Sequence, residues 1–404
     1  MIDLSRPVNL LSPDFMADKY AWYDRIREER PVHRAKISVM TVYTVARYDD
    51  CASLLKNPRV LRNRTTVTGG RRFPFPIPAS LKPMAESMIQ EDDPNHRRLR
   101  ELVRRGFRPQ AIADLEERID RYSRELLDDL EDAGEFDLQA RYALPIPVRM
   151  IAAMMGVSAE AMPAFQKSMG VVTRGFSGLR MLRTLFLDLP RTVNFVRDLI
   201  REKRDNPGDD ILTGLIQAED DGDRLSEDEL VGMVFLLIVA GFETTVHLIT
   251  NGVLTLLQHP DQLERLRADP TLIDSAVEEI LRHRGPVQST KLNYAMEDIT
   301  LHGVTIPRGK PIMPLLAAAN HDPRVFDDPL RFDIGRTPNR HLGFGHGVHF
   351  CLGAHLARAE TRLALRNLLK RFPDLRLAVE PSQLELQRMP GWHRYETLPV
   401  SARA

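Results

Sequence analysis

The chain has 404 residues, of which 43% are hydrophobic, so it can bury a large core. Its 56 basic and 56 acidic side chains balance, which leaves no overall field to attract nucleic acid or an anionic membrane. Residues 1–20 mix charged with apolar side chains, so they predict neither a signal peptide nor a membrane anchor, and we expect a cytoplasmic protein without a nucleic-acid partner.

Helical periodicity dominates the chain, and strand-like alternation is confined to short pieces such as Thr41–Ala46 and Ile299–Ile306. We find no internal repeat and no linker-like change of composition. We therefore expect one domain over residues 1–404, mainly α with small β-sheets. Only two cysteines occur, and Cys51 lies within a helical pattern, so no disulfide framework is implied. The proline-rich stretch Phe73–Pro78 predicts an ordered loop.

The segment that follows Asp93 is strongly basic. Helical spacing puts His96 and Arg100 on one face of the predicted helix. The other arginines form a more exposed set, for which a solvated surface and a docking surface for an acidic electron carrier are equally open interpretations. They are Arg97, Arg98, Arg104 and Arg105.

The longest predicted helix begins after Ser226. Ser226 and Glu229 have the spacing of a capping box, and an apolar run follows toward His259. About thirty residues that rise about 1.5 Å each span roughly 45 Å, the width of a domain. Glu243 interrupts the apolar run before it is long enough to cross a membrane, so we predict a buried core helix.

Unusual residue types lie in the middle of this helix, in Ala240–Thr245. Gly241, Glu243, Thr244 and Thr245 replace good helix formers in the most apolar part of the chain. A threonine hydroxyl can bond to a carbonyl one turn earlier, and glycine tolerates distortion. The helix can therefore open locally and expose a carbonyl or admit water, as expected of a dioxygen pocket.

Two later stretches predict scaffold rather than chemistry. Glu279 and Arg282 lie three residues apart, hence on one helix face, and can form an ion pair, although this spacing is common in charged helices. Residues 323–339 contain prolines and lack strong periodicity, so we predict a long ordered loop.

The most specific motif is Phe344-x2-Gly347-x3-Cys351-x-Gly353. A lone cysteine is more often a small buried hydrophobe than a metal ligand. Here the glycines let the backbone approach a ligand closely, and a helix predicted to begin near Leu352 points its N–H groups at the sulfur. Such surroundings lower the pKa of a thiol and favour a thiolate that binds a metal.

This motif resembles the haem-binding loop of the cytochrome P450 monooxygenases, and the resemblance extends from Pro31 to Val400. It implies the fold of that family, with haem b between the long helix and the cysteine loop. Cys351 would be the axial ligand of the iron, and Phe344 would shield its sulfur. Thiolate ligation favours cleavage of a bound O–O bond.

The resemblance also assigns residues around the haem. Glu243 and Thr244 would relay protons to iron-bound dioxygen, with Thr245 as a structural neighbour. The other residues that it implies are His96, Arg100 and His349 at the propionates, and Ala240 and Gly353 beside the ring.

Further implied positions concern the scaffold and the substrate. Glu279, Arg282 and Arg336 would form a buried network that pins residues 323–339. The substrate pocket would be lined by Leu236, Val239, Ala240, Val287, Ser289, Thr290 and Trp392. Further walls would come from Thr65–Met88 and Val171–Phe186, and loop arginines there would stay in water or meet a carboxylate; they are Arg71, Arg72, Arg180 and Arg183. The lining is mostly apolar or small, so a hydrophobic substrate follows.

One position departs from the family pattern. Where many soluble relatives place an arginine at a haem propionate, the spacing in this chain lands on Asn293. Haem retention would then depend more on His96, Arg100 and His349, and Lys291 could compensate.

We therefore predict a monooxygenase that inserts one oxygen atom of O2 into a C–H bond or alkene of a hydrophobic small molecule. Fatty acids, steroids, terpenoids and polyketides all remain open. Electrons would come from NAD(P)H through a separate reductase and a ferredoxin or flavodoxin, because no Gly-x-Gly-x-x-Gly follows a predicted strand. A monomer is the default expectation.

Two alternatives have to be weighed against this prediction. One is a peroxygenase that uses hydrogen peroxide, against which the presence of Glu243 and Thr244 argues. The other is a haem protein that only binds a gas or another ligand, which leaves that pair unexplained.

Overall fold

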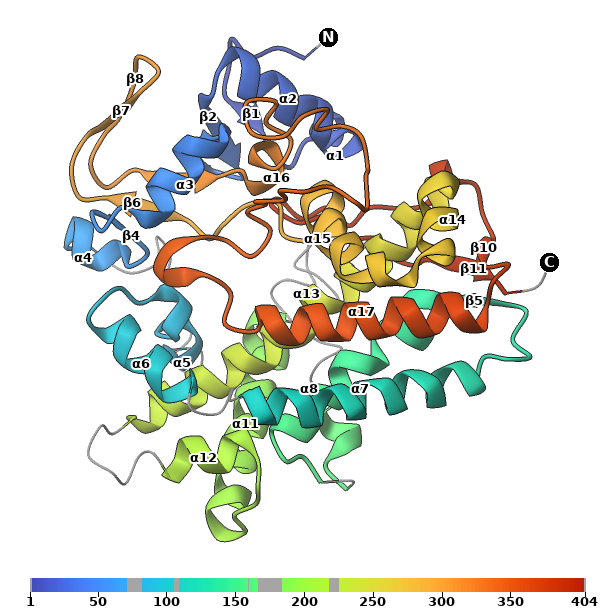
Figure 1. The fold of residues 1–404 in the computed structure, drawn as a ribbon. Coiled ribbons are helices and arrows are strands. Elements are labelled where there is room, and N and C mark those ends of the chain that lie inside the picture. Colours follow the sequence, from blue (N-terminus) through green and yellow to red (C-terminus); the bar gives the residue numbers. More distant parts are fainter. Residues whose placement is uncertain are drawn as a thin grey trace.

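The structure is a computed structural model, which describes residues 2–70, 82–104, 109–158, 160–165, 184–217 and 225–402. Figure 1 shows that most helices gather on one side of the molecule, while the N-terminal strands lie with the first helices on the other side. The predicted fold class, mainly α with small sheets, is confirmed.

The α-helices are α1 (Pro13–Ala17), α2 (Lys19–Glu29), α3 (Tyr48–Lys56), α4 (Arg64–Thr68), α5 (Lys82–Ala85), α6 (Asn95–Arg104), α7 (Pro109–Asp128), α8 (Pro145–Met154), α11 (Leu189–Asp205), α12 (Ile211–Gln217), α13 (Glu227–Gln258), α14 (Pro260–Ala268), α15 (Ile273–Arg284), α16 (Leu316–Ala319) and α17 (Ala354–Arg371). Short π-helical turns, η3 (Gln139–Ala143) and η4 (Thr184–Asp188), precede α8 and α11.

The helix α13 has the predicted start and length. The Ser226 hydroxyl accepts a hydrogen bond from the Glu229 N–H, and the Glu229 carboxylate accepts one from the Ser226 N–H. By length and composition this helix could cross a membrane, and among the described residues it is alone in this. However, 67% of its most apolar stretch is buried inside the protein, so it is a core helix.

The main hydrophobic core forms around α13. The helices α8, α11, α15 and α17 pack against it, and Phe242 of α13 is fully buried among them. Figure 1 shows α17 crossing α13. Burial of this apolar surface stabilises the helical side of the molecule at about 25 cal/mol per Å2.

The strands form three small sheets. They are β1 (Val8–Asn9), β2 (Val32–Ile37), β3 (Met40–Val45), β9 (Pro311–Pro314), β6 (Asn293–Ala295) and β4 (Val60–Leu61), in that spatial order; β10 (Arg376–Leu377), β11 (Pro399–Ser401) and β5 (Glu135–Asp137); and β7 (Ile299–Leu301) with β8 (Val304–Ile306). The alternating piece Ile299–Ile306 is a hairpin rather than one strand, because His302 and Gly303 turn through positive φ.

A buried ion network fixes the long loop that precedes the cysteine. Arg282 donates to both carboxylate oxygens of Glu279 at 2.7 and 2.8 Å, and both side chains are fully buried. Arg336 donates to the same carboxylate at 3.2 Å, and Arg282 also donates to the carbonyl groups of Pro329 and Arg331. The three residues therefore tie the irregular segment 323–339 to α15.

Candidate functional site

Cys351 lies in a loop between residue 342 and α17 that closes on itself. Its N–H donates to the carbonyl of Phe344 at 3.0 Å, and its side chain is half-buried. Gly347 has a φ of +70°, and a Cβ at this position would collide with the carbonyl oxygen of Leu55. Only glycine can therefore bring the turn so close to α3.

The thiol of Cys351 differs from the prediction. Burial raises its pKa, and this outweighs the lowering by the Gly353 N–H and by the charges of Arg100 and Arg358. The helix α17 begins at Ala354, later than predicted. The expected lowering of the pKa was wrong for the protein alone, so the thiolate depends on coordination, which removes the proton of a thiol directly.

Phe344 lies beside this loop. The guanidinium carbon of Arg358 is 4.6 Å from the centre of its ring, and the ring of Phe350 is 6.3 Å away. Arg358 is itself fixed by two hydrogen bonds to Glu278. The phenyl ring therefore has a defined place near the sulfur.

One stripe of α13 is exposed although the helix is buried elsewhere. Ala240 is exposed, and Leu236 and Thr244, one turn before and one turn after it, are half-buried. Val239, beside this stripe, is half-buried as well. The stripe thus offers a narrow open surface in the middle of a core helix, bounded by small and apolar side chains.

The helix does not open at this stripe, contrary to the prediction. The hydroxyl of Thr244 donates to the carbonyl of Ala240 at 2.8 Å and that of Thr245 to the carbonyl of Gly241 at 3.3 Å, but α13 continues without a break. A Cβ at Gly241 would collide with Ile151 of α8. This glycine therefore allows close helix packing rather than distortion.

Glu243 is turned toward the C-terminal segment. Its carboxylate accepts a hydrogen bond from Nη1 of Arg394, and both side chains are buried. Burial raises the pKa of Glu243, against the opposing effect of Arg394. A buried carboxyl with a raised pKa beside one cation is suited to hold and release a proton.

The predicted propionate ligands come together with a cation that the sequence did not reveal. The rings of His96 and His349 are 4.3 Å apart, and Arg100 lies one turn after His96 on α6. Arg62, just after β4, is buried, and its Nε and Nη1 have no hydrogen-bond partner within the protein. Burial of His349 and, next, the charge of Arg62 lower the pKa of His349 to about 2.

Arg97, Arg98 and Arg104 of α6 form ion pairs with nearby acidic side chains. Arg98 is half-buried and donates to Glu229 at the start of α13. Arg97 and Arg104 are exposed, and each pairs with an acid on or next to its own helix. Arg105 lies outside the described residues.

Asn293 has a structural role. It is buried in β6 and donates from Nδ2 to the Thr290 hydroxyl at 3.1 Å and to the Lys291 carbonyl at 3.0 Å. The pKa of Lys291 is lowered by burial and by Arg62, although Glu243 opposes this. The Lys291 ammonium therefore lies close enough to both Arg62 and Glu243 for their charges to act on it.

The predicted substrate wall is assembled from distant segments. Val287 and Trp392 pair as an isolated β-bridge, and a Cβ at Gly391 would collide with the hydroxyl of Ser289. Thr290 donates to the Lys291 carbonyl at 2.8 Å. Of the further predicted walls, residues 71–81 and 171–183 lie outside the described residues, and with them Arg71, Arg72, Arg180 and Arg183.

These residues fit the haem that the family resemblance implies. Nε and Nη1 of the buried Arg62, near His349, have no hydrogen-bond acceptor within the protein. A carboxylate such as a haem propionate would be a suitable acceptor. A Cβ at Gly353 would meet no atom within 4 Å, and Ala240 is exposed in the core helix, so both leave room for a flat group. A single thiolate on a porphyrin completes the chemistry of the site.

Sequence reasoning missed a polar stripe on α13. Glu243, His247 and Asn251 recur every four residues in an otherwise apolar helix, and all are buried. This spacing was a readable signal of a second polar face. Glu360 of α17 was missed as well: it is buried beside Thr245, and burial raises its pKa to about 8.

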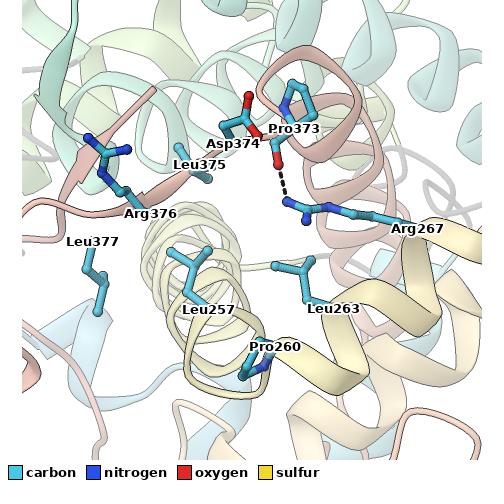
Figure 2. A pocket seen from close by; sticks show the side chains of 9 residues that line it. All are labelled: Leu257, Pro260, Leu263, Arg267, Pro373, Asp374, Leu375, Arg376 and Leu377. Atoms are coloured by element: carbon cyan, nitrogen blue, oxygen red, sulfur yellow. Dashed lines mark hydrogen bonds between the residues drawn. The ribbon is translucent and has the colours of Figure 1, made fainter. Parts of the chain in front are cut away.

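A hollow of about 480 Å3 lies at the C-terminal end of α13 (Figure 2). Its lining residues are Leu257, Pro260, Leu263, Arg267, Pro373, Asp374, Leu375, Arg376 and Leu377. Arg267 donates across it to the carbonyl of Pro373. Because Leu257 follows Glu243 by 14 positions, roughly 21 Å along the helix, this hollow is separate from the site described above.

Comparisons with known proteins agree with this geometry. A family model described as Cytochrome P450 matches residues 179–380. The chain is 37% identical over 393 residues to the polyketide biosynthesis cytochrome P450 PksS of Bacillus subtilis (strain 168), covering 96% of both chains. It is 40% identical to the cytochrome P450 monooxygenase PikC of Streptomyces venezuelae, over 97% of this chain and 93% of PikC. A solved structure of the myxobacterial cytochrome P450 CYP267B1 in complex with myristic acid matches with a TM-score of 0.90 and 38% identity, covering 98% of this chain and 99% of that one.

Proposed function

Because this chain belongs to the cytochrome P450 family, it is a haem-thiolate monooxygenase that acts on hydrophobic molecules, and we propose that its substrate is a polyketide-derived lactone or a long-chain fatty acid. PksS is named for polyketide biosynthesis, and CYP267B1 was solved with myristic acid. The exposed stripe at Leu236, Ala240 and Thr244 offers either substrate an apolar surface. This stripe is the observation that carries the proposal.

Haem b, held through Cys351, supplies the activation of O2 when it is bound. The chain supplies the surroundings. Arg62 and Arg100 would offer positive charge to the two propionates and His349 a hydrogen-bond donor, and His96 packs against His349. The loop glycine Gly347 brings the turn before Cys351 against α3, so close backbone packing positions the loop that carries the sulfur.

Protons reach the site from α13 in this proposal. Thr244 lies on the exposed stripe, and its hydroxyl, now bonded to the Ala240 carbonyl, can rotate to accept or donate a proton. Glu243 is the neighbouring acid, and the balance of burial against the Arg394 charge sets its pKa. Together they can pass protons to the open side of the stripe while the rest of the helix excludes water.

Electrons have to come from another protein. We propose a ferredoxin or flavodoxin with its NAD(P)H-dependent reductase, approaching a surface that includes Arg97 and Arg104. We further propose that the protein works in the cytoplasm as a monomer in one domain, without a nucleic-acid partner. A balanced formal charge supports the last point.

Two rival functions make different use of these residues. A peroxygenase receives protons and electrons with its peroxide, so it has no need of the Glu243–Thr244 pair. A gas or ligand carrier has no need of it either, whereas a monooxygenase uses such a pair to deliver protons. Replacing Thr244 by Ala distinguishes them, because a monooxygenase should then release its reducing equivalents as hydrogen peroxide.

The first test is the absorption spectrum of the purified protein, reduced and exposed to CO. We expect a Soret band moved far to the red, as thiolate-bound haem gives, and its loss in Cys351→Ser. Titration of the oxidised protein with macrolactones and with C12 to C16 fatty acids should then show which class displaces the water on the iron. An ordinary imidazole-type spectrum in the parent protein would overturn the ligand assignment, and a panel without any response would overturn the substrate proposal.

A further inference from the structure

The C-terminal segment Gly391–Tyr395 packs along α13 and forms a polar seam with it. Asn251 donates from Nδ2 to the carbonyl of His393 at 2.9 Å and to that of Arg284 at 3.0 Å. Two turns earlier, Arg394 pairs with Glu243. His247 lies between these two contacts on the same helix face. We call the interface of Glu243, His247 and Asn251 with His393 and Arg394 the polar seam.

The polar seam contains buried atoms without partners. They are Nδ1 of His247, Nδ1 of His393, Nε of Arg394 and Oδ1 of Asn251. Native proteins leave few such atoms unpaired, because a buried polar atom without a partner destabilises the folded state. Nε of Arg394 is a donor and Oδ1 of Asn251 is an acceptor, and water can satisfy both kinds of group. Internal water commonly occupies such places, since it needs only two to four polar partners.

The polar seam reaches the protein surface at Tyr20. The ring of His393 lies 5.7 Å from that of Tyr20 on α2 and 5.4 Å from that of Tyr395. Tyr20 is half-buried, and the Arg284 guanidinium lies 4.0 Å from the centre of its ring. Lys19, beside it, donates to the carbonyl of Trp392 at 2.6 Å and so holds the C-terminal segment against α2.

We propose that the polar seam holds a file of water molecules and conducts protons from the surface at Tyr20 to Glu243, with His393 and His247 as the transfer groups. The proposal rests on the function proposed above, in which Glu243 supplies protons to the site. It identifies where those protons come from, because Arg394, the charged partner of Glu243, does not release its proton in proteins. A neutral imidazole can accept a proton at one nitrogen and donate one from the other.

The proton and electron balance is simple. Each turnover uses one O2, two electrons from the external carrier and two protons; one oxygen atom enters the substrate and the other leaves as water. Both protons pass along the polar seam, and each histidine returns to its neutral form. Burial and then the charge of Arg394 lower the pKa of His247 to about 3. Burial, Arg284 and Lys19 lower the pKa of His393, so neither ring traps the charge.

The test compares His247→Phe and His393→Phe with two reference variants in the haem-loaded enzyme. His283→Phe is the matched control, because His283 is also buried with an unpaired Nδ1 but stacks on His321, outside the polar seam. Glu243→Gln removes the acid that receives the protons. Turnover is driven by a surrogate [2Fe–2S] ferredoxin and its NADPH reductase with myristic acid as substrate, in H2O and in D2O.

We expect both seam variants to lower the rate about tenfold, to raise the solvent isotope effect and to divert NADPH into peroxide, whereas His283→Phe keeps the parent values. If Glu243→Gln shows these defects and the seam variants behave like His283→Phe, the polar seam is not the route although the acid is. If Glu243→Gln is itself unaffected, the proposed relay fails first, and this result is distinct from failure of the seam.

A crystal structure of the parent enzyme gives a second measurement that needs no turnover. We expect ordered water within hydrogen-bond distance of Nδ1 of His247 and of Nδ1 of His393. A dry polar seam in a structure that resolves water elsewhere in the core would overturn the proposal.

Discussion

Arg394 and Glu243 form a buried ion pair although 151 positions separate them in the sequence. The pair fastens the C-terminal segment to the core helix α13 at the point where the helix carries its acid. The same contact therefore serves the fold and sets the proton affinity of the site.

Replacing Arg394 by Leu should destabilise the protein by about 3–5 kcal/mol at neutral pH, because it leaves a buried carboxylate without its partner. The pKa of Glu243, already raised by burial, should rise further. A group whose pKa is raised in the folded state stabilises at low pH and loses this contribution as pH increases. The variant should therefore lose less unfolding free energy, relative to the parent, at pH 5 than at pH 8. Urea titrations of the two proteins at both pH values measure this difference.

The matched control for this prediction is Arg97→Leu, which removes an exposed pair with Asp93. Exposed pairs contribute at most about 1 kcal/mol. A loss in Arg394→Leu no larger than in this control would contradict the assignment of a strong buried pair.

Acid should destabilise the protein through its buried histidines. The pKa of His247 is lowered to about 3, and those of His283, His321 and His393 are lowered as well, chiefly by burial. Below about pH 6.5 these histidines bind protons in the unfolded chain but stay neutral in the folded chain. The free energy of unfolding therefore falls as pH falls. Each histidine contributes at most about 1.4 kcal/mol per pH unit.

The variant His283→Phe checks this prediction. Its ring stacks with that of His321 and contacts Phe332, so phenylalanine can occupy the site. The midpoint of urea unfolding, measured from pH 7 to pH 5, should fall less steeply in the variant than in the parent. Parallel curves would show that the folded protein admits the proton at this position.

Glu360 should have the opposite effect on the pH dependence. Burial raises its pKa to about 8, with a small opposing effect of the Thr245 hydroxyl, so the folded chain keeps a proton that the unfolded chain releases above about pH 4.5. The contribution of Glu360 to the free energy of unfolding is fully present at low pH and is lost as pH rises toward 8. Glu360→Gln should remove that loss and gain stability over the parent at pH 8. Equal changes at pH 5 and pH 8 would contradict the raised pKa.

Local patterns made part of this structure predictable. Ser226 and Glu229 specify the start of α13 through contacts three residues apart, and the apolar run after them has one stable place, the core. The cysteine loop was recognisable because its glycines and Cys351 occur at fixed spacings. Glu279 and Arg282 were predictable as a pair for the same reason, since helical spacing alone brings them together.

The remaining features depend on contacts between distant segments. Arg62 follows a two-residue strand and has no pattern around it, yet the fold places it beside His349. Arg394 lies in an irregular segment, so no periodicity indicates its partner Glu243. The pKa of Cys351 could not be inferred from the nearby helix, because burial, a property of the whole fold, outweighs the local N–H groups and charges.

Arg62 should matter for retention of the haem. Arg62→Met removes a buried cation whose Nε and Nη1 lack partners in the protein, so folding should be preserved while a propionate loses a charged hydrogen bond. We expect haem to transfer from this variant to apomyoglobin about tenfold faster than it transfers from the parent. Arg97→Met, which alters an exposed arginine, should transfer at the parent rate. Equal rates for all three proteins would exclude Arg62 from the haem site.

Glu278 and Glu279 are neighbours in sequence with opposite surroundings, and this contrast gives the sharpest test of the scaffold. The carboxylate of Glu279 is fully buried and accepts hydrogen bonds from Arg282, Arg336, the Asp333 N–H and Asn339. That of Glu278 is half-buried and pairs with Arg358 and His341.

Glu279→Gln leaves the buried Arg282 without its counter-charge, so it should cost about 3–5 kcal/mol and loosen the segment 323–339 that leads to the cysteine loop. We expect a lower thermal midpoint and a reduced–CO spectrum that loses its thiolate band faster on warming than in the parent. Glu278→Gln should cost less than Glu279→Gln, because Glu278 and its partner Arg358 are both partly exposed. If the two variants lost the thiolate band at the same temperature, the buried network would not be what holds Cys351 in place.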